Sequence, residues 1–182
     1  MTTEPAGFLE GGQLRLRDVQ LSDVTDDCYV WMNDPEVTRY LETRVVPRSK
    51  ERIAAYVAEM AASNDSVFLA MIEKAKDRHI GNIKLGPINW IHRRADIALV
   101  IGDKRAWCKG YAAEAIGLVS EYAFQTLGLH KVTAGIDSNN SGSTAAFLQA
   151  GFVEEGRRRQ QYFCNGAWVD QVLLGRVRPA TL

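Results

Sequence analysis

The 182-residue sequence predicts an α+β fold built around one mixed sheet of about seven strands. Hydrophobic residues recur every two residues in some segments, as in strands, and at helical spacing in others. These segments follow one another in the order β-α-α-β-β-β-α-β-α-β-β. Two long strand-like runs near the C-terminus flank Asn165-Gly166, a dipeptide typical of tight hairpins. No repeat, low-complexity tract or linker interrupts the chain, so we expect residues 1–182 to form a single domain.

The first third of the chain combines one strand with two helices. Leu14, Leu16 and Val19 alternate with arginines, as in a half-buried strand, and Ser22-Asp23 offers an N-cap for the helix that follows. The expected elements are a loose lead-in over 1–12, a strand over Gln13–Val19, a helix ending at Asn33-Asp34-Pro35, a loop over Glu36–Val46 and a helix opened by Pro47–Glu51.

The remainder alternates strands with two further helices. Tyr111–Leu127 is the clearest helix, because its apolar residues recur at helical spacing and Gly128 closes it. Asn139–Ser143 caps a shorter helix that runs to Ala150. The expected strands are Val67–Glu73, His79–Trp90, Arg94–Ile101, Lys131–Ile136, Val153–Phe163 and Ala167–Val177.

Composition excludes several classes of function. The formal net charge is zero, from 22 basic and 22 acidic residues, so we expect no nucleic acid as a partner. No apolar run reaches membrane-spanning length, and the polar start lacks the features of a signal peptide, so no membrane partner is expected. The cysteines Cys28, Cys108 and Cys164 and the three histidines lack the spacing of metal ligands, which indicates no metal site and a reducing cytoplasm. A phosphate-loop nucleotide hydrolase is excluded because no G-x-x-x-x-G-K-[ST] motif is present.

The stretch from Trp107 to Ala115 carries the strongest functional signal. The apolar run Ile97–Ile101 leads into it and a helix leaves it, and such a strand, glycine-containing loop and helix start present backbone N–H groups to an anion. Gly110 and the small residues after it let a phosphate approach the main chain. An ordinary strand-to-helix connection has the same local pattern, so this stretch alone leaves both interpretations open.

Three motifs in this order resemble the GNAT superfamily of acyl-CoA-dependent N-acyltransferases. Trp107–Ala112 resembles the pyrophosphate loop Q/R-x-x-G-x-G/A, with Trp107 at the position usually held by Gln or Arg. Asn140–Ser143 with the ending Gly151-Phe152 is similar to N-x-x-S and x-L-x-x-x-G-F. Glu155-Gly156, Asn165-Gly166 and Asp170 look like the closing pattern of the branch with ribosomal-protein N-terminal (RimJ/RimL-like) and amino-sugar acetyltransferases. The resemblance covers about 13–177.

The resemblance implies helices on both faces of the sheet and a cleft for acetyl-CoA where Arg94–Ile101 splays from Lys131–Ile136. Pantetheine would pair with the backbone of Leu99–Ile101, and the pyrophosphate would sit on N–H groups of Cys108–Ala113, at the positive end of the following helix. Cys108 replaces the usual Gly, which costs little if its φ is negative; we expect a small filler rather than a redox group. The implied cofactor-binding residues are Leu99, Val100, Ile101, Trp107, Cys108, Lys109, Gly110, Tyr111, Ala112, Ala113, Asn140, Ser143 and Phe147.

The same resemblance implies direct attack of a neutral amine on the thioester. A bulge N–H at Val100 would polarise the thioester carbonyl. Phe147 stands where many members have a proton-donating Tyr, which leaves the hydroxyl of Ser143 either to protonate the leaving sulfur or to cap its helix. Tyr162 aligns with the position of the base, although a phenol with a pKa of ~10 is a poor base at neutral pH. The alternatives are Asp96, Asp170, Glu42 and a water relay.

The acceptor site is expected where the loop Glu36–Val46 and the hairpin Tyr162–Trp168 converge. Their rings and polar groups suit a small polar primary amine, with a nucleotide-linked amino sugar ahead of a protein N-terminus. A non-catalytic CoA-binding module, and a monomer or a homodimer, remain open. The expected substrate-binding residues are Trp31, Tyr40, Glu42 and Trp168.

Overall fold

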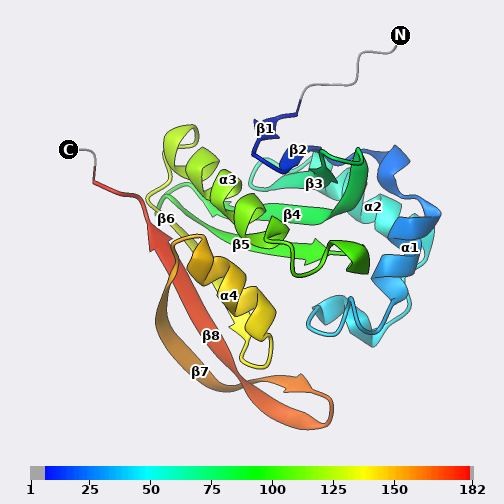
Figure 1. Ribbon diagram of the computed structural model, residues 1–182. Coiled ribbons are helices and arrows are strands. Elements are labelled where there is room, and N and C mark those ends of the chain that lie inside the picture. The colour runs from blue at the N-terminus through cyan, green and yellow to red at the C-terminus, as the bar shows by residue number, and fades with distance from the viewer. Residues whose placement is uncertain (1–6, 181–182) are drawn as a thin grey trace.

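The computed structural model describes residues 7–180 and contains one eight-stranded sheet with four α-helices (Figure 1). The strands are β1 (Leu9–Glu10), β2 (Leu14–Asp18), β3 (Val67–Glu73), β4 (Arg78–Asn89), β5 (Arg94–Ile101), β6 (Lys131–Asp137), β7 (Val153–Cys164) and β8 (Ala167–Val177). The helices are α1 (Asp26–Asn33), α2 (Lys50–Ala61), α3 (Tyr111–Gln125) and α4 (Ser141–Gln149), with short 3-10 segments η1 (Leu21–Asp23), η2 (Glu42–Val45) and η3 (Lys104–Ala106). The predicted α+β class, with one mixed sheet, is confirmed.

The sheet has the order β1-β2-β3-β4-β5-β6-β8-β7, and β5 and β6 are its one parallel pair among the described residues. These two strands pair only from Arg94–Lys131 to Asp96–Thr133. Beyond this point they diverge, as Figure 1 shows, and α4 lies beside the opening. The expected splayed pair is therefore present, and the remaining residues of β5 have a free edge.

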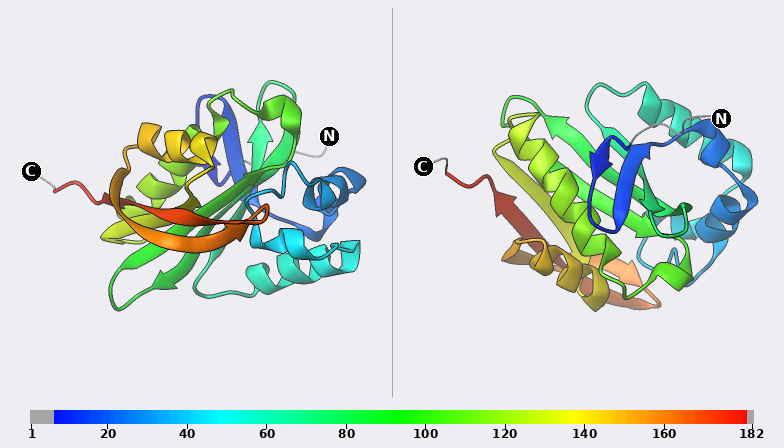
Figure 2. Two further views of the ribbon diagram at one scale, coloured as in Figure 1. Left: turned by 90° about the horizontal axis from the view of Figure 1, so that it is seen from below. Right: turned by 45° about the horizontal axis from the view of Figure 1, so that its top comes forward.

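Helices cover both faces of the sheet, as expected. In the left view of Figure 2, α2 lies on the opposite side of the sheet from α4. The alternation of side chains along β3 serves both faces: Leu69 and Met71 belong to the large core under α3, whereas Ala70 and Ile72 belong to a smaller one with Val57 of α2. The sheet therefore separates the space beneath α1 and α2 from the core under α3.

The N-terminal segment departs from the expected loose lead-in. Leu9 and Glu10 form β1 and pair with β2, which makes eight strands instead of about seven. The segment is held through Glu114 of α3, whose Oε1 accepts a hydrogen bond from the backbone N–H of Gln13 at 2.8 Å. No two-residue strand shows a periodicity, so this element leaves no pattern in the sequence. Residues 1–6 of the expected lead-in lie outside the described residues.

Candidate active site

A cleft of about 530 Å³ opens where β5 and β6 diverge. One wall is β5 with the loop that enters α3, and the others come from α4 and from the segment after α1. Of the thirteen residues expected to bind the cofactor, twelve line this cleft: Leu99, Val100, Ile101, Trp107, Cys108, Lys109, Gly110, Tyr111, Ala112, Ala113, Asn140 and Ser143. The exception is Phe147, which is 2% exposed and packs edge-on against Phe152 in the core, with ring centroids 4.9 Å apart.

The loop before α3 is shaped to hold an anion. Gly110 is the N-cap of α3, with φ +82°, and a Cβ built on it would meet no protein atom within 4 Å. A side chain there would project into open space at the positive end of a helix of 15 residues. Cys108 has φ +58°, so the condition under which a side chain there would cost little is not met, and the thiol is exposed, so it does not fill a gap in the core. Both residues adopt left-handed backbone because the chain must turn sharply to start the helix beside β5.

The indole of Trp107 fixes this loop to the sheet. Its Nε1–H donates a 2.8 Å hydrogen bond to the carbonyl of Ile101, at the end of β5. The position that departs from the superfamily pattern thus has a structural role of its own.

Buried charges anchor the start of α3. The hydroxyl of Tyr111 donates a 2.8 Å hydrogen bond to Glu73, a carboxylate that is only 3% exposed. Arg78 pairs with the second oxygen of Glu73 at 2.8 Å and with Asp103 at 3.0 Å. The hydrogen bond from Tyr111 and the charge of Arg78 hold the pKa of Glu73 below its usual value. Strands β3 and β4 are thereby tied to the helix N-terminus.

The register of β5 moves the expected oxyanion donor away from Val100. The ladder between β4 and β5 is regular from Gly81–Ile101 to Leu85–Ile97, and its irregularity lies at Leu85–Ile88, so there is no bulge at Val100. Because the N–H of Gly102 bonds to the carbonyl of Ile80, alternation along an antiparallel pair turns the polar groups of Val100 toward β4. The N–H groups that face the opening therefore belong to Leu99 and Ile101.

Ser143 lies in the first turn of α4 with its hydroxyl available to the cleft. The cap of this helix is Asn140, whose side-chain oxygen accepts the backbone N–H of Ser143 at 3.2 Å. Within residues 7–180 the Ser143 hydroxyl has no hydrogen-bond partner. Capping by Ser143 is thus excluded, and its Oγ is free to serve a ligand.

The loop after α1 meets the β7–β8 hairpin as expected. Arg44 of η2 donates a 2.7 Å hydrogen bond to the carbonyl of Phe163, and the hydroxyl of Tyr40 donates one of 3.0 Å to the carbonyl of Asn139. Tyr40 lines the cleft, whereas Glu42 is exposed and Trp168, 62% exposed, packs at a tilt against Phe163. Neither Glu42 nor Trp168 is among the residues that line this cleft.

Three of the groups considered as a base, Tyr162, Asp170 and Asp96, have other partners in the structure. Burial and the nearby charge of Glu42 raise the pKa of Tyr162, which makes its phenol a still poorer base. Asp170 accepts the backbone N–H of Gln160 at 2.9 Å and so stabilises the hairpin bulge. Asp96 accepts a hydrogen bond from Thr133 on the neighbouring strand.

A second cavity of about 380 Å³ lies beneath α1 and α2, against β3, β4 and β5. The lining residues that it shares with the cleft are Leu41, Leu99 and Val100. The two cavities therefore meet at the middle of β5. We call the second one the α1–α2 pocket.

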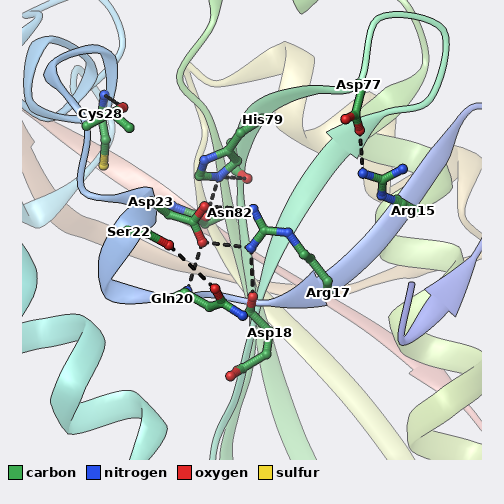
Figure 3. A network of polar contacts seen from close by, with 12 residues as sticks. Arg15, Arg17, Asp18, Gln20, Ser22, Asp23, Cys28, Asp77, His79 and Asn82 are labelled. Carbon is green, nitrogen blue, oxygen red and sulfur yellow. Dashed lines mark hydrogen bonds and ion pairs between the residues drawn. The ribbon is translucent and has the colours of Figure 1, made fainter. Parts of the chain in front are cut away.

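His79 projects into the α1–α2 pocket, and sequence reasoning missed it. Its Nε2 lies 3.0 Å from the carbonyl of Gly81 and 2.8 Å from the side-chain oxygen of Asn82. A backbone carbonyl only accepts, so Nε2 is the donor, and in the neutral ring Nδ1 is the nitrogen with the free lone pair. Figure 3 shows this ring above Asn82 and Asp23. The ring packs edge-on against Trp31, at 5.3 Å between centroids, so Trp31 supports the pocket without lining it.

An irregularity in β4 explains why His79 was not foreseen. The partners of Met71 and Ile72 are Gly81 and His79, so Ile80 is an extra residue on β4. This bulge brings His79 to the face that carries Asn82 and Lys84, all three of which line the pocket. The strict two-residue alternation of the sequence places His79 on the other face.

Burial raises the pKa of the Cys28 thiol, which also lines the pocket, to about 11.

The chain is similar in sequence and in fold to known N-acetyltransferases. Uncharacterized N-acetyltransferase YoaA of Bacillus subtilis is 30% identical over 174 residues, which are 94% of this chain and 97% of the relative. Spermidine N(1)-acetyltransferase of Vibrio cholerae is 33% identical over 100 residues, 55% of this chain and 57% of the relative. The crystal structure of spermidine N-acetyltransferase from Vibrio cholerae in complex with CoA and spermine has a TM-score of 0.81 at 25% identity, and covers 91% of this chain and 96% of that chain.

The matching family agrees with the geometry of the cleft. Residues 13–153 match the acetyltransferase (GNAT) domain family. The match includes the splayed pair, the loop at Gly110 and α4 with Ser143, and the relatives named above are N-acetyltransferases. The comparisons leave the expected RimJ/RimL-like or amino-sugar branch unassigned. The chain is an acetyl-CoA-dependent N-acetyltransferase that belongs to the GNAT acetyltransferase family.

Proposed function

We propose that the chain acetylates a small polar primary amine that reaches β5 through the α1–α2 pocket. The observation that carries this proposal is the wall common to the two cavities, where Leu99 and Val100 line both. A donor lying along the free edge of β5 and an amine entering from the opposite side would meet there. Acetyl-CoA supplies an activated acyl group as a thioester, and the protein aligns the amine with it.

The residues of the cleft fit coenzyme A. Open space beside Gly110 leaves room for a pyrophosphate on the N-terminus of α3, and Lys109 and Arg39 bring positive charge to the same cleft. The backbone N–H groups of Leu99 and Ile101 are suited to pair with amide carbonyls and to stabilise an oxyanion. Ser143 carries the hydroxyl suited to protonate a thiolate.

His79 is suited to receive the proton of the amine. Its Nδ1 lone pair belongs to a ring held by Asn82 and Trp31, and proton transfer through one water is compatible with general-base catalysis. We expect His79→Gln to lower kcat by about 10²-fold or more, with the Kd of acetyl-CoA within twofold of the parent value. His130→Gln, at an exposed histidine outside both cavities, is the matched control. Normal turnover of His79→Gln would remove this residue from the mechanism.

For the acceptor we propose a nucleotide-linked amino sugar, with a protein N-terminus as the alternative. Two of the relatives carry spermidine in their names, which makes a polyamine the third class to test. Release of free thiol from acetyl-CoA should be measured with an amino-sugar nucleotide, a peptide and spermidine as acceptors. Turnover of the peptide without turnover of the amino sugar would place the protein N-terminus ahead of the amino sugar as the acceptor.

The three free cysteines fit a reducing compartment such as the cytoplasm.

A further inference from the structure

We propose that the α1–α2 pocket contains an anion subsite, built by Arg48, Lys84 and Thr43, so that the acceptor is a primary amine that also carries a carboxylate or phosphate group. This inference rests on the proposed function, because it takes the pocket to be the entry of the amine.

Unbalanced positive charge in the pocket is the first observation. Its lining includes the cations Arg48, Arg52 and Lys84 and one carboxylate, Asp23. Asp23 is already engaged: its two oxygens each accept a 2.7 Å hydrogen bond from Arg17, and one also accepts the backbone N–H of Gln20 at 2.8 Å (Figure 3). Within the described part of the chain, the three lining cations form no ion pair. The pocket therefore has cationic groups in excess and no free carboxylate to balance them.

Unsatisfied buried polar atoms are the second observation. The Nε of Arg48 and the Oγ1 of Thr43 are buried, and neither has a hydrogen-bond partner among residues 7–180. Leaving such a group unpaired costs about 1–3 kcal/mol, and more for a charged group. Arg17, which is also partly buried, shows the usual arrangement, with both terminal nitrogens on one carboxylate. Both residues line the pocket, so a carboxylate or phosphate bound there supplies the kind of acceptor that each of them lacks.

The position of Arg48 is fixed by its backbone. Its N–H donates to the side-chain oxygen of Asn33 at 2.9 Å, and its carbonyl accepts from the side-chain nitrogen of Asn33 at 2.9 Å. This double hydrogen bond joins the end of α1 to the start of α2. The main chain from which the Arg48 side chain enters the pocket lining is thereby fixed, which lowers the ordering cost of an anion site there.

Charge complementarity then separates classes of acceptor. A polyamine would bring a second ammonium group beside Arg48 and Lys84, where like charges repel. An amine with an anionic group would gain charge-assisted hydrogen bonds at one end while its amine reaches Leu99 and Val100 at the other. An amino sugar on a nucleotide carrier has this chemistry, as do amino acids and phosphorylated amines.

The test compares matched amines. Steady-state thiol release should be measured with 4-aminobutyrate against butylamine, and with glucosamine 6-phosphate against glucosamine, with spermidine as the polycation. We expect kcat/KM to be at least tenfold higher for the amine with the anionic group in at least one pair. The pair that shows this difference identifies the preferred group as a carboxylate or a phosphate. In Arg48→Met this preference should fall at least tenfold. Arg178→Met, at an exposed arginine outside the pocket, should leave it unchanged.

Lys84→Met provides a second variant if Arg48→Met does not fold. An equal or better turnover of the amines without an anionic group by the parent protein would overturn the anion subsite while leaving the proposed function intact. Absence of thiol release with every amine would instead count against the proposed function. In that case the affinities of 4-aminobutyrate and butylamine should be measured by calorimetry, which tests the anion subsite without requiring turnover. Equal affinities would refute the subsite.

Discussion

Gly110 is the residue at which a single substitution tests the cofactor site most directly. Gly110→Asp places a carboxylate where a Cβ meets no protein atom within 4 Å, so the new side chain clashes with nothing in the protein. The backbone is left-handed there, with φ +82°, and Asp and Asn tolerate this region better than other residues with a side chain. The fold should therefore survive, and the effect should fall on the ligand.

The expected loss of affinity follows from Coulomb's law. Opposing a carboxylate to two phosphate charges at about 5 Å costs about 1.7 kcal/mol in water, or about 15-fold in Kd. Lower effective permittivity in the cleft would increase this value, and the electrostatic part would decrease with added salt. Gly110→Asn is the matched control, because it has the same shape and the same backbone strain without the charge.

Calorimetry with CoA is the assay, at low and high salt, with thermal unfolding to verify that both variants fold. We expect Gly110→Asp to bind at least tenfold more weakly than the parent and clearly more weakly than Gly110→Asn. Unchanged CoA affinity in a folded Gly110→Asp protein would falsify the assignment of the pyrophosphate to this loop.

Three further outcomes are expected. Ser143→Ala should lower kcat by about 10²-fold or more with little change in acetyl-CoA Kd or melting temperature, because Asn140 caps α4; a stability loss at normal turnover would contradict this. Tyr111→Phe removes a hydrogen bond to a buried carboxylate and should cost about 1.5–3 kcal/mol of unfolding free energy in denaturant titrations; an unchanged midpoint would contradict it. The pKa of Glu73 is lowered in the fold, so its stabilisation is present above the unfolded pKa of ~4.3 and is lost as the pH falls through the folded pKa. Thermal unfolding from pH 7 to pH 3 should show this loss, and less of it in Glu73→Gln.

The sequence predicted the frame of the site because local patterns specify it. The apolar run before Trp107, the glycine at 110 and the cap at Asn140 are each read within a few residues, and all three line the cleft in the structure. Such features depend on neighbours in the chain, so one sequence is enough to recognise them.

The residues that were missed depend on ladder irregularities and on tertiary contacts. One extra residue in β4 brings His79 to the pocket face, and the regular register of β5 turns the N–H of Val100 away from the opening. A bulge leaves no periodic signal, since a single residue shifts the phase of the strand around it. The excess positive charge of the pocket was equally hidden. Arg48 and Lys84 are 36 positions apart in the sequence and line one cavity only when α2 packs on β3, the strand that pairs with β4.

The site is thus a consequence of where pairing between two strands stops. Past Asp96–Thr133 no strand satisfies the outer edge of β5, and a backbone edge of this kind must find other partners. The indole of Trp107 takes the carbonyl of Ile101, which leaves the N–H groups of Leu99 and Ile101 to an amide-bearing ligand. Because the side chains of the same stretch border the α1–α2 pocket, the proposed function brings donor and acceptor to one strand from opposite sides. Under that proposal, the divergence of β5 and β6 provides both the binding edge for the donor and its meeting point with the acceptor.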